Sequence, residues 1–371
     1  MDFGRFANLL IFAVGILLAL AAGRAQFGRP QRALAIALLL MLMLAVPFLT
    51  NTPASIFDAL TAMCIAYGWN FIGGYTGYAS FGNVAYVGLG AYVAASFMSR
   101  QVGHPRWPWF VAMPLAVVIT AAVAGLLGLA VLRLRGHYFS IATLGISVAM
   151  PQIVNWEFLF GPEGFARTGI AKNVFNDGRP LNFPLIQDAT VGGLTIPADH
   201  AIYYLGLLAA LIGLGVTAWL SRSKFGYSLV AIRENEEAAE VLGINTTLHK
   251  ILAYMLSAGL AALGGAMLGY RLVNMTTEPD GIFSTVNNLQ MIIICLIGGV
   301  GTLWGPWIGA FVLFGLQEIL RTASGSQGIL QWQAVIFSCL IILVVLFLPR
   351  GLLHVVRTRT RAAAEPAQTT A

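Results

Sequence analysis

The sequence predicts an all-α polytopic membrane protein with about 10–11 transmembrane helices. Of the 371 residues, 58% are hydrophobic and 10% are charged, whereas a soluble domain carries about 25% charged residues. The mean hydropathy is +0.79. Long apolar runs alternate with polar loops, and inside a lipid bilayer only a helix or a closed barrel satisfies its own backbone hydrogen bonds.

Apolar segments follow one another along the whole chain. The candidate spans are residues 6–22, 33–49, 55–74, 84–98, 110–132, 138–156, 201–220, 251–272, 286–299, 307–320 and 331–348. Arginines gather after the first span, at residues 24–32, and after the last, at residues 350–361. Basic loops stay in the cytoplasm, so the N-terminus is expected outside and the C-terminus in the cytoplasm.

The chain divides into three predicted parts. Residues 1–50 hold N-terminal transmembrane segments, residues 51–350 form the main transmembrane domain, and residues 351–371 form a tail expected to be disordered. Residues 157–200 make the longest polar region, rich in proline and in turn signals such as Asn176-Asp-Gly178. A loop of this length is often functional, and we expect it on the outer side of the membrane.

A glycine-rich stretch, Gly74 to Asn83, interrupts the apolar spans and predicts a broken or re-entrant segment. Irregular backbone at membrane depth must be buried in protein or line a cavity. Neutral polar residues here and in nearby spans are candidates for the lining of a translocation path. These candidates are Asn70, Tyr75, Ser80, Asn83, Thr143 and Asn287. Each could equally make hydrogen bonds between helices.

The region from residue 222 to residue 247 is the most polar interruption after the outer loop. Four glutamates and one arginine lie between Arg233 and Glu240, and such a segment belongs outside the lipid because each charge there costs a few kcal/mol. We predict one short helix, with Ser228 as N-cap and Gly243 as its C-terminal stop.

Helical periodicity divides this predicted helix into two faces. The apolar face holds Leu229, Ile232, Ala239 and Leu242, and the polar face holds Arg233, Glu237 and Glu240. Arg233 and Glu237 are spaced for an i,i+4 ion pair. A solvated loop helix is one interpretation of this pattern, and a docking surface is the other.

The sequence offers no catalytic, metal or cofactor site. Cys64, Cys295 and Cys339 lie in apolar runs without metal-ligand spacing, and the five histidines are scattered. A phosphate-binding loop places lysine after glycine, and none of Lys172, Lys224 and Lys250 does so. The basic residues lie in short loops, so nucleic-acid binding is not expected. We predict that the chain is not an enzyme and that any ATP chemistry comes from a partner.

Three stretches together resemble one family of transport proteins. Gly68 to Tyr92, Phe225 to Ile244 and Leu296 to Ala310 are similar to branched-chain amino acid permeases of ABC importers, and closest to the larger of the two related permease subunits. Residues 138–144 and 161–164 add weaker matches. Many ABC importer permeases carry Ile-x-Leu-Pro after the acidic motif, whereas this chain has Asn245 to Lys250.

The resemblance implies a role for the acidic helix. In this family a short cytoplasmic helix with the spacing Glu-Ala-Ala-x-x-x-Gly, here Glu237 to Gly243, docks into an ATPase subunit and is called the coupling helix. The residues that this assigns to ATPase coupling are Arg233, Glu237, Ala238, Ala239, Leu242 and Gly243.

The resemblance also implies partners and a location. They are a second homologous permease, two cytoplasmic ATPase subunits and a periplasmic binding protein, in a bacterial inner membrane. The implied cargo is a branched-chain or other hydrophobic amino acid, with urea or a short amide as the alternative. An ion-coupled secondary transporter is the rival class and usually needs an acidic residue at mid-membrane depth. We find none there, and interpret Glu318 as a solvated charge at an outer span end.

Overall fold

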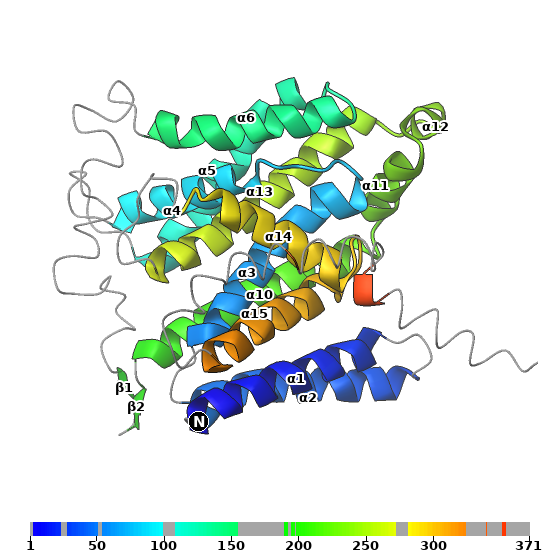
Figure 1. Cartoon of the computed structure of the whole chain (residues 1–371). Helices are drawn as coiled ribbons and strands as arrows, with labels where there is room; N and C mark the ends of the chain where they lie inside the picture. The colour runs from blue at the N-terminus through cyan, green and yellow to red at the C-terminus, as the bar shows by residue number, and fades with distance from the viewer. Residues whose placement is uncertain are drawn as a thin grey trace, which may run out of the picture. The chain divides into compact units, whose positions relative to one another are not determined.

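The structure, a computed structural model, describes residues 3–23, 28–50, 54–98, 108–154, 189–191, 194–196, 198–271, 281–323, 339 and 351–353. Its helices are α1 (Phe3–Gly23), α2 (Arg29–Leu49), α3 (Ala54–Trp69), the π-helix η1 (Asn70–Tyr75), α4 (Asn83–Met98), α5 (Trp109–Val131), α6 (His137–Val154), α10 (Ala198–Leu220), α11 (Lys224–Glu234), α12 (Glu236–Val241), α13 (Thr246–Arg271), α14 (Thr285–Gly298) and α15 (Gly305–Ala323) (Figure 1).

The predicted all-α membrane fold is confirmed. Among the described residues, seven helical stretches are long and apolar enough to cross a membrane, and α4, α14 and α15 supply three shorter apolar helices. Large apolar side chains such as Val118, Leu126, Ile141 and Val148 are exposed on α5 and α6, where lipid would cover them. The predicted last span, residues 331–348, lies almost wholly outside the described residues.

The helices fall into two compact units, and the larger runs from Leu60 to Ile292. Its centre is α13, which packs along α4 and α5 (Figure 1). Small side chains allow the close approach, because Ala258, Ala261 and Ala262 of α13 are almost completely buried. In lipid, where apolar burial gives little drive, such contacts hold helices together by close van der Waals packing.

The second unit combines residues 1–59 with residues 293–371. In it α1 packs against α2 and α15, and the ring of Phe12 meets the ring of Phe311 edge-on at 5.4 Å. Glu318 of α15 is 5% exposed, so the prediction that it is a solvated charge is wrong. The sequence places it near the end of a span, where a solvated charge is common, but its side chain is covered by protein.

The glycine-rich stretch is broken as predicted. The backbone leaves α3 through the π-helix η1 and then runs without helical hydrogen bonds until α4 begins at Asn83. We call residues 70–82 the broken segment. A π-turn inside a helix frequently marks a functional site.

The outer loop contributes a small element and little else that the structure describes. Strands β1 (Ala189–Val191) and β2 (Leu194–Ile196) form an antiparallel hairpin in which Ala189 pairs with Ile196. Residues 157–188 of the predicted loop lie outside the described residues. Both strands precede α10 in the chain, and the predicted all-α character therefore applies to the membrane part of the fold.

Candidate functional site

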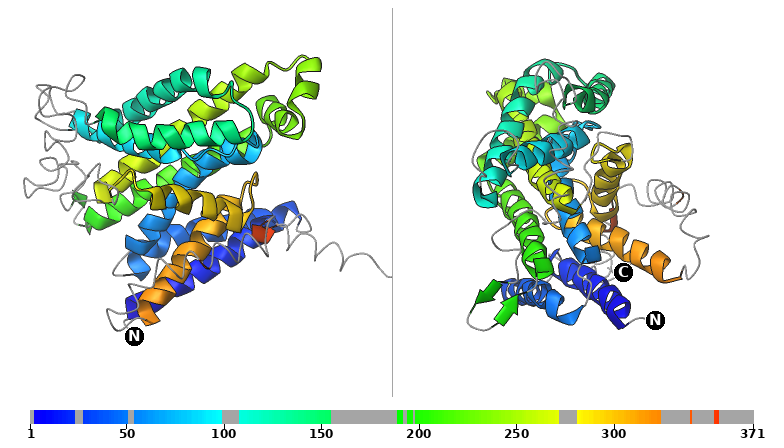
Figure 2. Two further views of the ribbon diagram at one scale, coloured as in Figure 1. Left: turned by 45° about the horizontal axis from the view of Figure 1, so that its top comes forward. Right: turned by 90° about the vertical axis from the view of Figure 1, so that its left-hand side faces the viewer.

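The predicted single helix at the acidic stretch is in fact two helices. Ser223, not Ser228, caps α11, because its Oγ accepts a hydrogen bond from the Gly226 amide at 3.0 Å. The chain turns extended at Asn235, which ends α11 and caps α12 by accepting from the Ala238 amide at 3.0 Å. The left view of Figure 2 shows α11 and α12 just beyond the N-terminal end of α13. Asparagine is a strong N-cap, so one residue explains the break.

Gly243 ends α12 in the manner that the sequence predicts. Its φ of +83° lies in the left-handed region, which favours glycine. The Gly243 amide donates to Glu240 O at 2.9 Å, and the Ile244 amide donates to Ala239 O at 3.0 Å. This pair of bonds is a Schellman motif. Asn245 then caps α13 by accepting from the Leu248 amide at 3.0 Å, and the chain returns to the membrane.

The break changes which side chains face outward. Leu229, Ile232 and Ala239 are buried, but Leu242 is 79% exposed, so the prediction that all four share one face is wrong. Val241 beside it is 88% exposed. A continuous helical period from Leu229 to Leu242 cannot hold, because the extended residue Asn235 resets the helical phase.

The predicted ion pair between Arg233 and Glu237 is also wrong. Arg233 instead contacts Glu234 at 2.8 Å, and its Nη1 donates to the carbonyl oxygen of Gly74 in the broken segment at 3.1 Å. Glu237 lies across from Arg135, with 3.5 Å between Nη1 and Oε1. Both partners of this second pair are mostly exposed, so it contributes little to stability.

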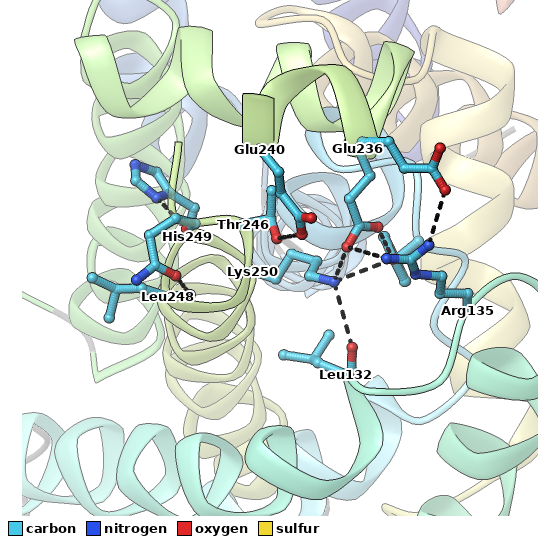
Figure 3. Close-up of polar contacts among 11 residues, drawn as sticks. Leu132, Arg135, Glu236, Glu240, Thr246, Leu248, His249 and Lys250 are labelled. Carbon is cyan, nitrogen blue, oxygen red and sulfur yellow. Dashed lines mark hydrogen bonds and ion pairs between the residues drawn. The ribbon is translucent and has the colours of Figure 1, made fainter. Parts of the chain in front are cut away.

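A buried charge cluster joins the two short helices to the membrane part. The Lys250 side chain is 5% exposed, and its amine donates to Glu236 Oε1 at 2.6 Å, to the Tyr78 hydroxyl at 3.3 Å and to Leu132 O at 3.5 Å. Figure 3 shows Glu236 between Lys250 and Arg135. The Tyr78 hydroxyl donates to Glu236 Oε2 at 2.6 Å. Both carboxylate oxygens of Glu236 are thus bonded.

The cluster shifts the titration of its two acids. Burial alone would raise the pKa of Glu236, but hydrogen bonds from Lys250 and Tyr78 and the charges of Lys250 and Arg135 outweigh it, and the pKa is lowered. Burial raises the pKa of the Tyr78 hydroxyl, and the bond to the negative Glu236 raises it further. At neutral pH the cluster therefore holds a carboxylate and a neutral phenol.

The translocation-path candidates lie mostly in one buried polar group. Asn70, Tyr75, Ser80, Asn83 and Thr143 are all buried. Ser80 Oγ donates to Asn83 Oδ1 at 3.4 Å, and Thr143 Oγ1 accepts from the Phe81 amide at 3.1 Å. Asn287 is half-buried on α14 and is not part of this network as described. In this conformation Ser80 therefore bonds to Asn83, and Thr143 bonds to backbone.

Side chains from three helices bond to carbonyls of the broken segment, and a fourth bond follows at its end. Trp69 Nε1 of α3 donates to Ser80 O at 2.7 Å, and Ser140 Oγ of α6 donates to Ala79 O at 2.8 Å. Asn288 Nδ2 of α14 donates to Phe81 O, and Asn83 Nδ2 donates to Ser257 Oγ of α13 at 3.1 Å. The bonds to Ser80 O, Ala79 O and Phe81 O satisfy carbonyls that a regular helix would bond, and the bond of Asn83 to Ser257 joins the start of α4 to α13. Asn288 is among the polar residues of the spans for which interhelical hydrogen bonds are expected from sequence, whereas Ser257 is not.

One surface of α12 remains uncovered. We call Glu237, Ala238, Val241 and Leu242 the α12 outer face, because all four are exposed. Two large apolar side chains lie beside a charge there, on a helix outside the candidate membrane spans. Among the described residues no three His, Cys, Asp or Glu side chains gather to hold a metal ion. The arrangement suits contact with another protein.

The seven candidate spans among the described residues make this a polytopic membrane protein, and its family makes it a permease subunit of an ABC transporter and not an enzyme. The family described as "Branched-chain amino acid transport system / permease component" matches residues 51–346, and the chain belongs to this family.

Curated relatives include several importer permeases. The chain is 27% identical to the high-affinity branched-chain amino acid transport system permease protein LivM of Salmonella typhimurium, over 87% of this chain and 75% of the relative. It is 28% identical to the inner membrane ABC transporter permease protein YjfF of Escherichia coli, over 69% and 72%. It is 25% identical to the galactose/methyl galactoside import permease protein MglC of Salmonella typhimurium, over 61% and 66%. No solved structure matches the chain.

Proposed function

We propose that this chain imports branched-chain amino acids across a bacterial inner membrane, together with a second permease and two ATPase subunits. The observation that carries the proposal is the α12 outer face, where Val241 and Leu242 are 88% and 79% exposed on a helix outside the spans. The family membership agrees with it, since the relative LivM is named as a branched-chain amino acid permease. On this proposal the face lies in the cytoplasm and docks into the ATPase.

The lysines of the chain indicate which subunits hydrolyse ATP. Nucleotide hydrolysis needs a lysine in a glycine-rich loop. Lys172, Lys224 and Lys250 do not follow glycine, and the amine of Lys250 is already bonded to Glu236. ATP hydrolysis is therefore assigned to the partner subunits, and the chain contributes the path and the docking surface.

The substrate assignment rests on the family and on neutral polar chemistry. Ser80, Asn83 and Thr143 carry no charge. Such side chains can hydrogen-bond the charged groups of a zwitterionic amino acid without forming an ion pair with either of them. In this conformation Ser80 bonds to Asn83, and Thr143 accepts from the Phe81 amide, so the path opens when the network around the broken segment rearranges. We assign docking of the periplasmic binding protein to the outer loop at residues 157–200.

Association with the ATPase tests the docking surface. Leu242→Asp removes about 2 kcal/mol of apolar burial and leaves an unpaired charge in the interface. At about 1.4 kcal/mol per tenfold, the affinity for the ATPase should fall by at least about 100-fold. The matched control is Leu242→Met, which keeps size and apolarity and should bind as the parent does. Equal ATPase affinity for the Asp and Met variants would contradict the proposal.

Uptake by the reconstituted importer tests the substrate and the energy source. Labelled leucine should enter vesicles when ATP is present, and excess unlabelled valine should compete while galactose and urea should not. A sodium or proton gradient without ATP should drive no uptake. Gradient-driven uptake by this chain alone would favour an ion-coupled secondary transporter.

A further inference from the structure

A buried lysine lies where three separate parts of the larger unit meet. The amine of Lys250, at the start of α13, reaches Glu236 on α12, Tyr78 in the broken segment and the carbonyl of Leu132 at the end of α5. It also lies 5.1 Å from the centre of the Tyr78 ring. The last carbonyls of α5 are the negative end of the helix dipole, which favours a cation there.

Tyr78 connects this cluster to the membrane part. Its hydroxyl donates to Glu236 and accepts from Lys250, and its ring packs edge-on against Phe139 at 5.2 Å. Arg233 makes a second connection, from α11 to Gly74 O. The two short helices outside the spans are therefore bonded directly to residues 74 and 78 of the broken segment, far along the chain.

The part of the broken segment after η1, residues 76–82, is suited to movement because none of its residues belongs to a helix. Side chains donate hydrogen bonds to its carbonyl oxygens at Ala79, Ser80 and Phe81. A few side-chain hydrogen bonds rearrange more readily than the consecutive backbone hydrogen bonds of a helix. The same segment carries Ser80 and, at its end, meets Asn83 of the proposed path. A displacement of α12 would move Tyr78, which lies two residues before Ser80 in the sequence.

We propose that Tyr78 is the positioning residue that transmits the movement of α12 to the broken segment, through its bonds to Glu236 and Lys250. The proposal rests on the function proposed above and names the contact that couples the ATPase side to the path. Stability alone accounts poorly for this cluster, because burying an ion pair is often no better than an apolar replacement. Coupling requires two elements that move together.

The first test is the conservative variant Tyr78→Phe in the reconstituted importer. It deletes the hydroxyl but keeps the ring against Phe139 and the ion pair of Lys250 with Glu236, so folding and ATPase association should persist. Leucine uptake per ATP hydrolysed should fall by at least about fivefold, the lower end of typical coupling between two sites. The matched control is Tyr138→Phe, at an exposed tyrosine on α6, which should keep the parent ratio.

The second test follows the broken segment itself. Ser80→Cys is placed in a background in which Cys64, Cys295 and Cys339 are replaced by alanine, and its rate of labelling by a small thiol reagent is measured with and without ATP. ATP should change the rate when Tyr78 is present and leave it unchanged in the Tyr78→Phe background. A purely structural role would alter both rates in parallel.

The outcomes separate this proposal from the proposed function. A Tyr78→Phe importer with the parent uptake ratio and the parent ATP response at Ser80→Cys would overturn the role of Tyr78 while leaving ATPase docking intact. A parent chain that binds no ATPase at all would overturn the proposed function, and the role of Tyr78 with it.

Discussion

The close contact of α4 with α13 makes a quantitative prediction about Gly265. A Cβ at this position would lie 2.0 Å from the carbonyl oxygen of Val87, far inside the separation that real side chains adopt. Gly265→Ala therefore forces the two helices apart by roughly 1 Å, and gaps of that size forfeit a quarter to a half of each dispersion contact.

The expected destabilisation is about 3 kcal/mol, the upper end for an overpacked core, because the neighbouring atom is backbone and cannot rotate away. A Cβ at Gly90 on α4 would lie 2.4 Å from the Cα atom of Ala262, so the helices cannot pivot about that point. At about 2–4 °C per kcal/mol for a domain of this size, the melting temperature in detergent should fall by roughly 6–12 °C.

Thermal unfolding followed by size-exclusion chromatography measures this shift. The matched control is Gly145→Ala on α6, where a Cβ meets no atom within 4 Å and alanine favours the helix. The control should melt at or slightly above the parent temperature. If Gly265→Ala melted with the control, the close packing of α4 on α13 would be refuted.

Three further predictions concern α12 and its cluster. Gly243→Val costs about 1–2 kcal/mol at φ +83° and should weaken ATPase affinity about tenfold, whereas Gly243→Asn should be tolerated. The pKa of Glu236 is lowered on folding, so the stabilising effect of its carboxylate is fully present above pH 4.5, the ordinary Glu value. This effect is lost as pH falls through the folded pKa. Proteolysis within α11 and α12 should increase in that acidic range, and Glu236→Gln should remove this pH dependence. Lys250→Met should destabilise by about 3 kcal/mol, and adding Glu236→Leu should restore the melting temperature but not uptake.

Local signals predicted much of the fold. Apolar runs marked the spans that the structure describes, and glycine at residue 243 marked the end of α12. The broken segment was predictable because Gly74, Gly77 and Gly82 fall close together where a span should continue. In each case a few consecutive residues determine the outcome.

The candidate site was less predictable because distant residues make it. Lys250 looks like ordinary loop charge at the head of a span, yet it bonds to Tyr78, 172 residues away. The error at Leu242 has a local cause, since Asn235 is an N-cap residue and its effect on the helical phase could have been anticipated. No periodicity within one segment indicates which carbonyls of another segment need a donor.

Photo-crosslinking at position 242 tests the docking of α12 most directly. A photo-reactive amino acid replaces Leu242 in the importer assembled with its ATPase subunits, and mass spectrometry identifies what it captures. The matched position is Leu144 on α6, which is 45% exposed within a span and should capture lipid. Capture of the ATPase from position 242 is the predicted result. Capture of lipid or of this chain alone would contradict the assignment of the α12 outer face to ATPase docking.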